Sequence, residues 1–521
     1  MSAPPASGGP REPDAGSGLI EPDFTAFARL YEDGVPQVVW TRLVADLETP
    51  VSAMLKIAHE RPNSFLLESV EGGAKRGRYS IIGCEPDLIW RAQGNTAEIN
   101  RSPVANPDGF ELETQRALAS LRALLAESEI ALPDALPPMA AGIFGYMGYN
   151  TVRLTEALPG GKPDDLGLPD SIMVRPTLIV IFDSIKDELS VVTPVRPTEG
   201  VSAEAAFARA GERLNVILER LDQPLPHLSE LDSDVPHPAP RAATGPDAYR
   251  ARVARAKEYI AAGDIFQVVL SQRFEAPFEL PPFSLYRALR RVNPSPFLYY
   301  LNFGGFSVVG SSPEILVRVR KGEVTIRPIA GTRPRGATPD EDRALAEELL
   351  ADPKECAEHL MLLDLGRNDV GRVSEVGSVR VTDSFFLEYY SQVMHIVSNV
   401  VGKLSQGHDA VGALMAGFPA GTVSGAPKVR AMEIIDELED SARGIYAGCV
   451  GYFSANGEMD SCIVLRTSVV KDGVMYVQAG AGIVADSIPE NEQVECVNKA
   501  GALFKAAEEA VRFAARAKRG Q

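Results

Sequence analysis

The sequence predicts an α+β protein, because segments with helical and with strand periodicity alternate in both halves of its 521 residues. In the first half, residues 51–60 have helical spacing, while residues 64–69, 79–83 and 171–184 have the β-branched composition of strands. In the second half, a predicted helix over 249–262 precedes a predicted strand over 265–274. Residues 315–327 alternate about Lys321-Gly322, which is typical of a hairpin and favours antiparallel pairing over a parallel βαβ unit.

A proline-rich break divides the chain. Six prolines between Pro224 and Pro246 interrupt every apolar pattern, so we expect a linker over residues 223–246. This linker separates an expected N-terminal domain, residues 19–222, from a second domain, residues 247–521. Residues 1–18 are rich in Pro, Gly, Ala and Ser and have neither the basic start nor the apolar run of a signal peptide. We expect them to form a disordered tail.

Charge and cysteine content exclude several classes of function. The chain has 52 Lys and Arg against 70 Asp and Glu, and this net charge of −18 argues against a nucleic-acid partner and against an anionic membrane surface. Five cysteines without a Cys-x-x-Cys pair indicate reduced thiols, not a disulfide framework or a zinc site. We therefore expect an acidic cytoplasmic protein that binds neither nucleic acid nor membrane.

Two acidic stripes lie on predicted helices. Asp352 and Pro353 have the pattern of a helix start, and Glu355 and Glu358 then share one face of that helix. A second helix, which begins near residue 489, places a similar set on one face: Glu492, Glu495 and Lys499. Each stripe alone also fits a capped helix start or a solvated face. If the two stripes converge, they would suit a hard cation such as Mg²⁺, which one or two carboxylates hold while other positions stay open for substrate.

Glycine-rich turns and two isolated polar residues complete the candidates. Turns over residues 330–336, 420–428 and 478–482 could offer backbone N–H groups to a small anion, although tight turning alone also explains their glycines. His395 lies in an apolar stretch, where a histidine is more often a core residue than a catalyst. Arg466 lies in a β-branched stretch, where its charge needs a partner such as a carboxylate.

Taken together, these strings resemble the chorismate-binding enzymes, most closely the component I subunits of anthranilate synthases. In the second half the likeness rests on ordered strings over 263–269, 310–314, 328–336, 358–362, 421–430 and 478–484. The first half contributes fewer, over 66–69 and 77–83. The resemblance implies an anthranilate synthase component I-like fold with antiparallel β-sheets flanked by helices. It also implies a lyase of tryptophan biosynthesis that converts chorismate and ammonia to anthranilate and pyruvate.

Two positions separate branches of this family. Family members that add water to chorismate carry a lysine base where this chain has Gln267, and a glutamine cannot accept the proton of water. Aminodeoxychorismate synthases typically carry a nucleophilic lysine where this chain has Ala330. Anthranilate formation is therefore the favoured hypothesis. The component I subunit of an aminodeoxychorismate synthase and a non-catalytic regulator that binds chorismate or tryptophan remain as alternatives.

The resemblance also implies the site residues. It places Mg²⁺ on Glu358 and Glu495, and it gives catalytic roles to Gln267, Glu314 and His395, with Glu355 as a weaker candidate. Glu314 is the candidate general acid for loss of the C4 hydroxyl, and His395 is a candidate base for the second step. The implied substrate contacts are Gly331, Thr332, Thr422, Tyr446, Arg466, Gly480, Gly482 and Lys499.

A partner and an effector follow from the same resemblance. No cysteine lies in the Gly-x-Cys-x-Gly string of a glutaminase, and Cys449, the nearest candidate, has the wrong spacing. We therefore expect a separate glutamine amidotransferase subunit, anthranilate synthase component II, to supply ammonia, in a heterotetramer. The family's feedback site for L-tryptophan maps onto Ser69, Pro296, Phe297, Leu298 and Tyr452.

Overall fold

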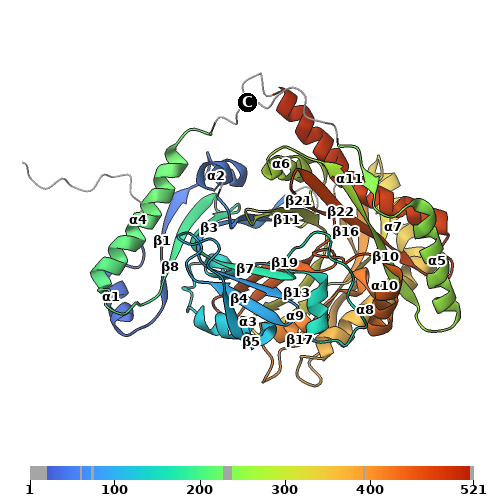
Figure 1. The fold of residues 1–521 in the computed structure, drawn as a ribbon, viewed down its shortest axis with the longest axis horizontal. Coiled ribbons are helices and arrows are strands. Elements are labelled where there is room, and N and C mark those ends of the chain that lie inside the picture. The colour runs from blue at the N-terminus through green and yellow to red at the C-terminus, as the bar shows by residue number, and fades with distance from the viewer. Residues whose placement is uncertain (1–19, 59–60, 72–74, 227–237, 391–392, 517–521) are drawn as a thin grey trace, which may run out of the picture.

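The computed structural model describes residues 20–58, 61–71, 75–226, 238–390 and 393–516. The expected tail over 1–18 and the centre of the expected linker, 227–237, lie outside these residues. Every ladder between the described strands is antiparallel, and helices flank the sheets (Figure 1). The predicted α+β class with antiparallel sheets is confirmed.

One run of strands crosses the molecule from the first half of the chain to the second. Its order is β1 (Gln37–Val44), β8 (Glu188–Val195), β7 (Ser171–Asp183), β3 (Lys75–Gln93), β2 (Ser64–Glu71), β11 (Phe297–Asn302), β12 (Ser307–Ser312), β21 (Thr467–Lys471), β22 (Val474–Ile483) and β10 (Gln267–Pro277). Short strands β9 (Arg241–Ala242) and β18 (Gly425–Ala426) add to β10, and β4 (Thr96–Asn100) and β5 (Glu111–Arg116) extend β3. The β2–β11 ladder joins the two halves directly.

A second run starts from the same long strand, β7. It continues through β6 (Gly142–Met147), β19 (Cys449–Ser454), β20 (Met459–Ile463), β13 (Ile315–Arg320), β14 (Glu323–Ile326) and β17 (Val393–Lys403). Strands β15 (Ile329–Pro334) and β16 (Arg380–Tyr389) both pair with β17. The β6–β19 ladder is a second direct link across the expected domain boundary, so the two halves are interleaved.

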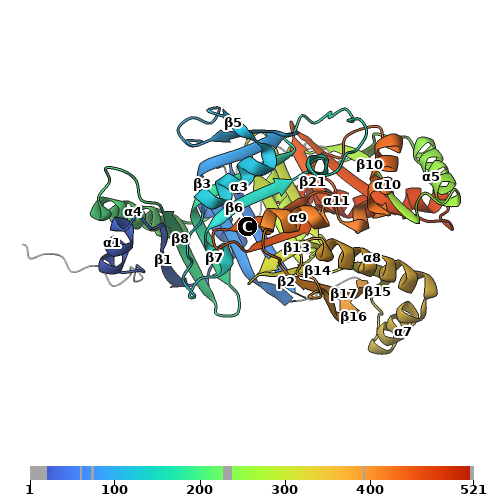
Figure 2. The ribbon, with the colours of Figure 1, turned by 90° about the horizontal axis from the view of Figure 1, so that it is seen from below.

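Helices cover these sheets from the outside. In the first half they are α1 (Phe24–Glu32), α2 (Pro50–Ile57), α3 (Ala117–Glu127) and α4 (Ala203–Asp222), with 3-10 turns η1 (Pro138–Ala140) and η2 (Tyr149–Leu154). In the second half they are α5 (Pro246–Ala261), α6 (Pro282–Val292), α7 (Pro339–Ala351), α8 (Pro353–Gly371), α9 (Ala410–Gly417), η3 (Gly421–Val423), α10 (Lys428–Leu438) and α11 (Pro489–Arg516). Helices α1 and α4 lie beside β1 and β8 in Figure 1, and Figure 2 shows α7 and α8 beside β15 to β17.

Several predicted elements are confirmed with changed ends. The hairpin about Lys321-Gly322 is β13–β14, and Asp352 caps α8 by accepting hydrogen bonds from the backbone of Lys354 and Glu355. The strand predicted over 79–83 belongs to the longer β3, which runs to Gln93. Glu85 and Pro86 interrupt the apolar alternation, but a register shift beside them lets β3 continue against β7. The expected linker also contains β9, which pairs with Phe274 and Glu275.

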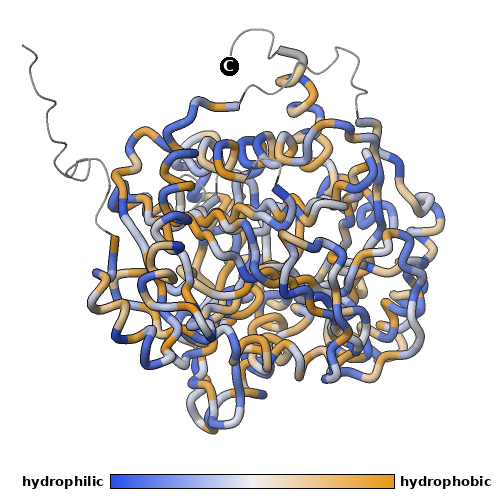
Figure 3. The backbone as a smooth tube through the Cα atoms, turned by 60° about the vertical axis from the view of Figure 1, so that its left-hand side comes forward, coloured by the Kyte–Doolittle hydropathy of each residue, from blue (hydrophilic) through white to orange (hydrophobic). Residues whose placement is uncertain are grey.

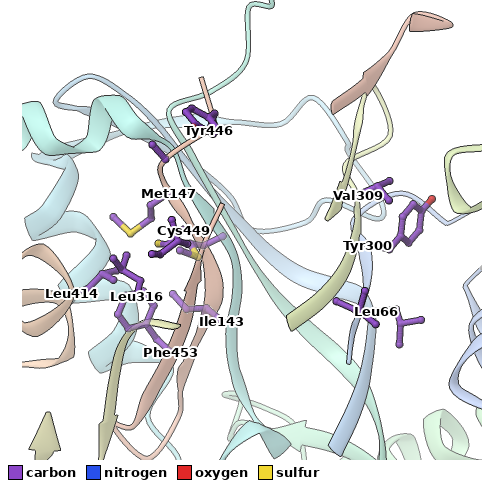
Figure 4. Close-up of a cluster of buried hydrophobic side chains, with 14 of the residues drawn as sticks. Leu66, Ile143, Met147, Tyr300, Val309, Leu316, Leu414, Tyr446, Cys449 and Phe453 are labelled. Atoms are coloured by element: carbon purple, nitrogen blue, oxygen red, sulfur yellow. The ribbon is translucent and has the colours of Figure 1, made fainter. Parts of the chain in front are cut away.

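Buried side chains from several elements form the core. In Figure 4, Leu316 and Leu414 meet Met147, Cys449 and Phe453, which come from β6 and β19. Cys449 is 2% exposed, as expected of a small core residue, and all five cysteines are free thiols. Hydrophobic and hydrophilic stretches alternate along the tube of Figure 3. Within the described residues, no helix combines the length and the hydropathy that a membrane crossing needs.

Candidate active site

Gln267 and Glu358 meet where β10 begins. Gln267 is 4% exposed, and its Nε2 donates a hydrogen bond to Glu358 Oε1 at 3.2 Å. Gly482 of β22 lies opposite Val269 of β10. A Cβ at Gly482 would stand 2.7 Å from Gln267 Nε2. A side chain at this position would therefore push the Gln267 amide from its place. The Gln267 Oε1 has no hydrogen-bond partner among the described residues.

The two acidic stripes lie near each other. Burial raises the pKa of Glu358, the Gln267 hydrogen bond lowers it, and the charges of Glu355 on α8 and Glu495 on α11 raise it again. Burial also raises the pKa of Glu492, with a further contribution from Glu495. Lys499 Nζ stands 2.7 Å from Glu495 Oε1. Carboxylates from both helices therefore lie close enough to repel one another.

This group has the donor chemistry of a hard-cation site. Mg²⁺ prefers carboxylate oxygens and needs only one or two of them when substrate and water complete the shell. No set of three or more metal-ligating side chains occurs among the residues described. Glu358 and Glu495 therefore suit a cation shared with a substrate carboxylate, not a closed structural site. Glu355 is held by an arginine, with Arg333 Nη1 at 3.1 Å from its carboxylate.

Glu314 is a buried carboxyl group beside Thr422. It is 5% exposed, and Thr422 Oγ1 donates a hydrogen bond to its Oε1 at 2.8 Å. Burial raises the pKa of Glu314 to about 8, against the opposing effect of Thr422 and a backbone N–H of Ile329. The side chain therefore keeps its proton at neutral pH. A carboxyl group in this state suits general-acid chemistry.

His395 on β17 faces the bulge of β15. Its Nδ1 lies 2.9 Å from the Gly331 carbonyl oxygen and 3.1 Å from Thr332 Oγ1. A carbonyl oxygen only accepts, so Nδ1 carries the hydrogen and the neutral ring keeps a free lone pair on Nε2. Burial lowers the pKa of His395 against the opposing effect of the Gly331 hydrogen bond, and the charge of Arg466 lowers it further than the charge of Glu388 raises it. This imidazole is therefore neutral at pH 7 and suits a base.

Arg466 has no ion-pair partner among the described residues. Burial lowers the pKa of its guanidinium, and its backbone has a φ of 48°. Its carbonyl oxygen accepts from the backbone N–H of Ser311 at 3.1 Å, which fixes the residue beside β12. The described part of the chain therefore offers Arg466 no carboxylate, and a substrate carboxylate fits the role.

Tyr446, Gly480 and Lys499 form one edge of the site. Lys499 Nζ donates to the Gly480 carbonyl oxygen at 2.9 Å. A Cβ at Gly480 would stand 2.9 Å from the Tyr446 hydroxyl and 2.8 Å from the Leu270 carbonyl oxygen. Gly480 thus allows the phenol to approach the strand. Tyr446 is buried, and burial raises the pKa of its hydroxyl, so it stays protonated and can donate.

A buried ion pair supports this edge, and the sequence alone did not reveal it. Arg443 and Glu439 pair at 2.6 Å with side chains 1% and 4% exposed. Glu439 accepts from the Ser271 backbone at 2.7 Å, and Arg443 donates to the Val423 carbonyl oxygen at 2.7 Å. The pair therefore ties β10 to η3, which carries Thr422. In the sequence, the two residues show only an i, i+4 spacing of opposite charges, and this spacing more often indicates an ion pair on the surface of a helix.

The expected effector residues come together around the β2–β11 ladder. Phe297 lies directly opposite Ser69, and Leu298 lies opposite Glu68. Pro296 precedes β11, while Tyr452 comes from β19 and shares a buried cluster with Phe65 of β2. The ring of Phe144 packs against both of these rings. Its centroid lies 5.5 Å from that of Tyr452 and 4.6 Å from that of Phe65.

Comparisons with known proteins identify the family of the chain. The family model described as "chorismate binding enzyme" matches residues 65–505. The chain is 57% identical to anthranilate synthase component 1 of Cereibacter sphaeroides over 506 residues, covering 95% of this chain and 99% of that protein. It is 49% identical to anthranilate synthase component 1 of Pseudomonas putida, covering 93% and 97%.

Solved structures show the same fold. The crystal structure of anthranilate synthase component I from Streptococcus pneumoniae superposes with a TM-score of 0.72 at 38% identity, covering 82% of this chain and 92% of that one. The menaquinone-specific isochorismate synthase from Escherichia coli superposes at 0.68 with 19% identity, covering 93% and 99%, which shows a shared fold alone. The resemblance inferred from the sequence is confirmed. The chain belongs to the chorismate binding enzyme family, among its anthranilate synthase component 1 members.

Proposed function

We propose that this chain is the synthase subunit of an anthranilate synthase, which converts chorismate and ammonia to anthranilate and pyruvate in tryptophan biosynthesis. The observation that carries the proposal is a neutral Gln267 amide bonded to Glu358 at 3.2 Å. An amide in this position cannot take a proton from water, so a nucleophile that needs no such base, ammonia, is favoured. The identity to component 1 proteins over nearly the whole chain supports the same reaction.

In the first step, ammonia attacks C2 of chorismate and the C4 hydroxyl leaves. The departing oxygen needs a proton, and Glu314 is protonated at neutral pH because burial raises its pKa to about 8. The Thr422 hydroxyl holds Glu314 Oε1, which fixes the direction of the carboxyl group. Arg466 and Tyr446 would bind the enolpyruvyl carboxylate, since a guanidinium and a phenol both donate to it.

In the second step, a base removes the C2 proton and pyruvate leaves as the ring becomes aromatic. We assign this base to His395, because its Nδ1 is committed to the Gly331 carbonyl oxygen and its Nε2 can accept. Burial lowers its pKa, which keeps it in the basic form. Glu355 is the poorer base, because its carboxylate is held by Arg333.

A cation and a partner complete the proposal. Mg²⁺, when bound, would offset the charge of the ring carboxylate, and Glu358 and Glu495 would hold it. The backbone of Gly331, Gly480 and Gly482, with Thr332 and Lys499, would line the ring side of the substrate. A separate glutamine amidotransferase subunit would supply ammonia in a cytoplasmic heterotetramer. L-tryptophan would bind beside Ser69 and inhibit the reaction.

The test is direct. Purified chain is mixed with chorismate, Mg²⁺ and an ammonium salt at alkaline pH, and anthranilate fluorescence and pyruvate release are followed. We expect both products, and we expect both to disappear when a chelator removes Mg²⁺. An amino-chorismate that keeps its pyruvyl group would instead indicate an aminodeoxychorismate synthase component. No turnover with ammonium or with glutamine and the partner subunit would indicate a non-catalytic binding protein.

A further inference from the structure

A small cavity lies beside Glu314, between α8 and the segment that leads into η3. Glu314 and Thr422 line one part of it, and Leu362, Asp369 and Ala420 line others. Its volume is about 30 Å³. A cavity of this size has room for water, provided that polar groups hold the water in place.

Asp369 supplies such a polar group. The residue is 4% exposed, and its Oδ2 accepts from Lys428 Nζ at 2.8 Å. Its Oδ1 has no hydrogen-bond partner among the residues that the structure describes. Buried oxygens of this kind are nearly always satisfied, by protein or by ordered water. Because Asp369 lines the cavity, water inside the cavity is the fitting partner for Oδ1.

Glu314 needs a supply of protons in the proposed reaction. It gives one proton to the departing hydroxyl in each turnover and is left as a carboxylate. Since only 5% of the residue is exposed, bulk solvent does not reach it freely. Asp369 is a second carboxyl group in the cavity wall, and it is paired with Lys428, whose side chain lies behind it and is 10% exposed.

We propose that water in this cavity returns a proton to Glu314 from the Asp369–Lys428 pair in every turnover. The C4–O bond breaks with its electron pair on oxygen, which takes the Glu314 proton and leaves as water. The Glu314 carboxylate then takes a proton from the cavity water, the water takes one from the pair, and the pair regains one from solvent. The inference rests on the proposed function. Asp369 acts through Glu314 and does not touch the substrate.

The test compares a single turnover with steady-state turnover in the full chain. With enzyme in excess over chorismate at pH 7, the proton already on Glu314 serves the one reaction, so Asp369→Asn should keep the wild-type rate. With chorismate in excess, reloading is required, and kcat should fall about tenfold or more. Asp436→Asn is the matched control, because Asp436 is also a buried aspartate in an ion pair, with Arg153, but is not a wall residue of this cavity.

A second pair of variants tests the cavity itself. Ala420→Val adds bulk to the cavity wall and should slow steady-state turnover while sparing the single turnover. Ala416→Val changes a buried alanine that does not line the cavity, and the ratio of its single-turnover rate to its steady-state rate should equal that of the wild type.

Equal losses in the single-turnover and the steady-state rate of Asp369→Asn would mean a structural role and would overturn the inference. Unchanged rates in both phases would overturn it as well. If the wild type makes no anthranilate at all, the proposed function is wrong, and this inference is then wrong as well.

Discussion

The Gln267 amide on β10 is bonded to the Glu358 carboxylate on α8, so one hydrogen bond joins the start of this strand to the helix that carries Glu355 and Glu358. Gln267→Leu removes the donor and leaves the Glu358 charge less compensated. A hydrogen bond to a charged group contributes about 1.5–3 kcal/mol, so kcat/KM for chorismate should fall about 10- to 100-fold. Initial rates of anthranilate fluorescence measure this loss.

Gln272 provides the matched control for that variant. It is a buried glutamine on the same strand, and its Nε2 donates to the amide oxygen of Gln493 at 2.8 Å and not to a carboxylate. Gln272→Leu should lower the melting temperature but keep kcat/KM within about twofold of the wild type. Equal kinetic losses in the two variants would contradict a specific role for Gln267.

The protonation of Glu314 predicts a pH limit. Its pKa is raised to about 8, so the general acid is lost as the pH rises through 8, and kcat/KM at constant free ammonia should fall above that pH. Glu314→Gln cannot donate and should lose about 10²- to 10⁴-fold in kcat at neutral pH. An activity profile that stays flat to pH 10 would contradict the assignment.

The same group predicts how stability changes with pH. A carboxyl group whose pKa is raised on folding binds its proton more tightly in the folded state, so this contribution is fully present below the unfolded value of 4.5 and is lost as the pH rises to about 8. Glu314→Gln removes that dependence. The difference in unfolding temperature between variant and wild type should therefore grow in favour of the variant between pH 5 and pH 9 in thermal scans.

Arg466 predicts a change in substrate affinity. The described residues offer Arg466 no carboxylate, so its guanidinium is free to bind one of the substrate. Arg466→Gln removes this cation, and the KM for chorismate should rise about 10- to 100-fold. Arg318→Gln is a suitable control, because Arg318 bonds to Asp460 at 3.1 Å on another strand pair. A KM that is equal in both variants would place the substrate carboxylate elsewhere.

Ser69 predicts a change in regulation. Ser69→Phe puts a large ring against Phe297, its direct neighbour across the β2–β11 ladder. The concentration of tryptophan that halves activity should rise about tenfold or more, while activity without tryptophan is kept. Ser64→Ala, at the other end of β2, should leave the inhibition unchanged. Inhibition that is equally strong in both variants would remove tryptophan from this position.

Local signals explain what the sequence could predict. The cap of α8 by Asp352 and the turn at Lys321-Gly322 are decided by neighbouring residues, so both were predicted correctly. The end of β3 was not, because its continuation past Pro86 depends on pairing with β7, which is far away in sequence. Strand partners of that kind leave no local mark.

The residues of the candidate site were likewise predicted from the sequence only in part. The family motifs pointed to Glu314 and His395, but the tautomer of His395 follows from the Gly331 carbonyl oxygen, which only the fold brings near. Asp369 was overlooked, although it lies ten residues after His359 on the buried face of α8 that also holds Leu362 and Gly366. Helical spacing could have marked it as a carboxylate turned toward the core.

The interleaving of the two halves limits how this enzyme can be recombined. Strand β2 must find β11, and β6 must find β19, although the two strands of each pair lie in different halves of the chain. A chimera that joins the first half of one relative to the second half of another at residues 223–246 would create two ladders between side chains from different parents. Exchanging β2 together with β11, and β6 together with β19, would keep these two ladders within one parent but would move the mismatch to their other neighbours, β3, β12, β7 and β20. Whether a junction is tolerated in this protein therefore depends on the ladders that it divides and not on its place in the linear sequence.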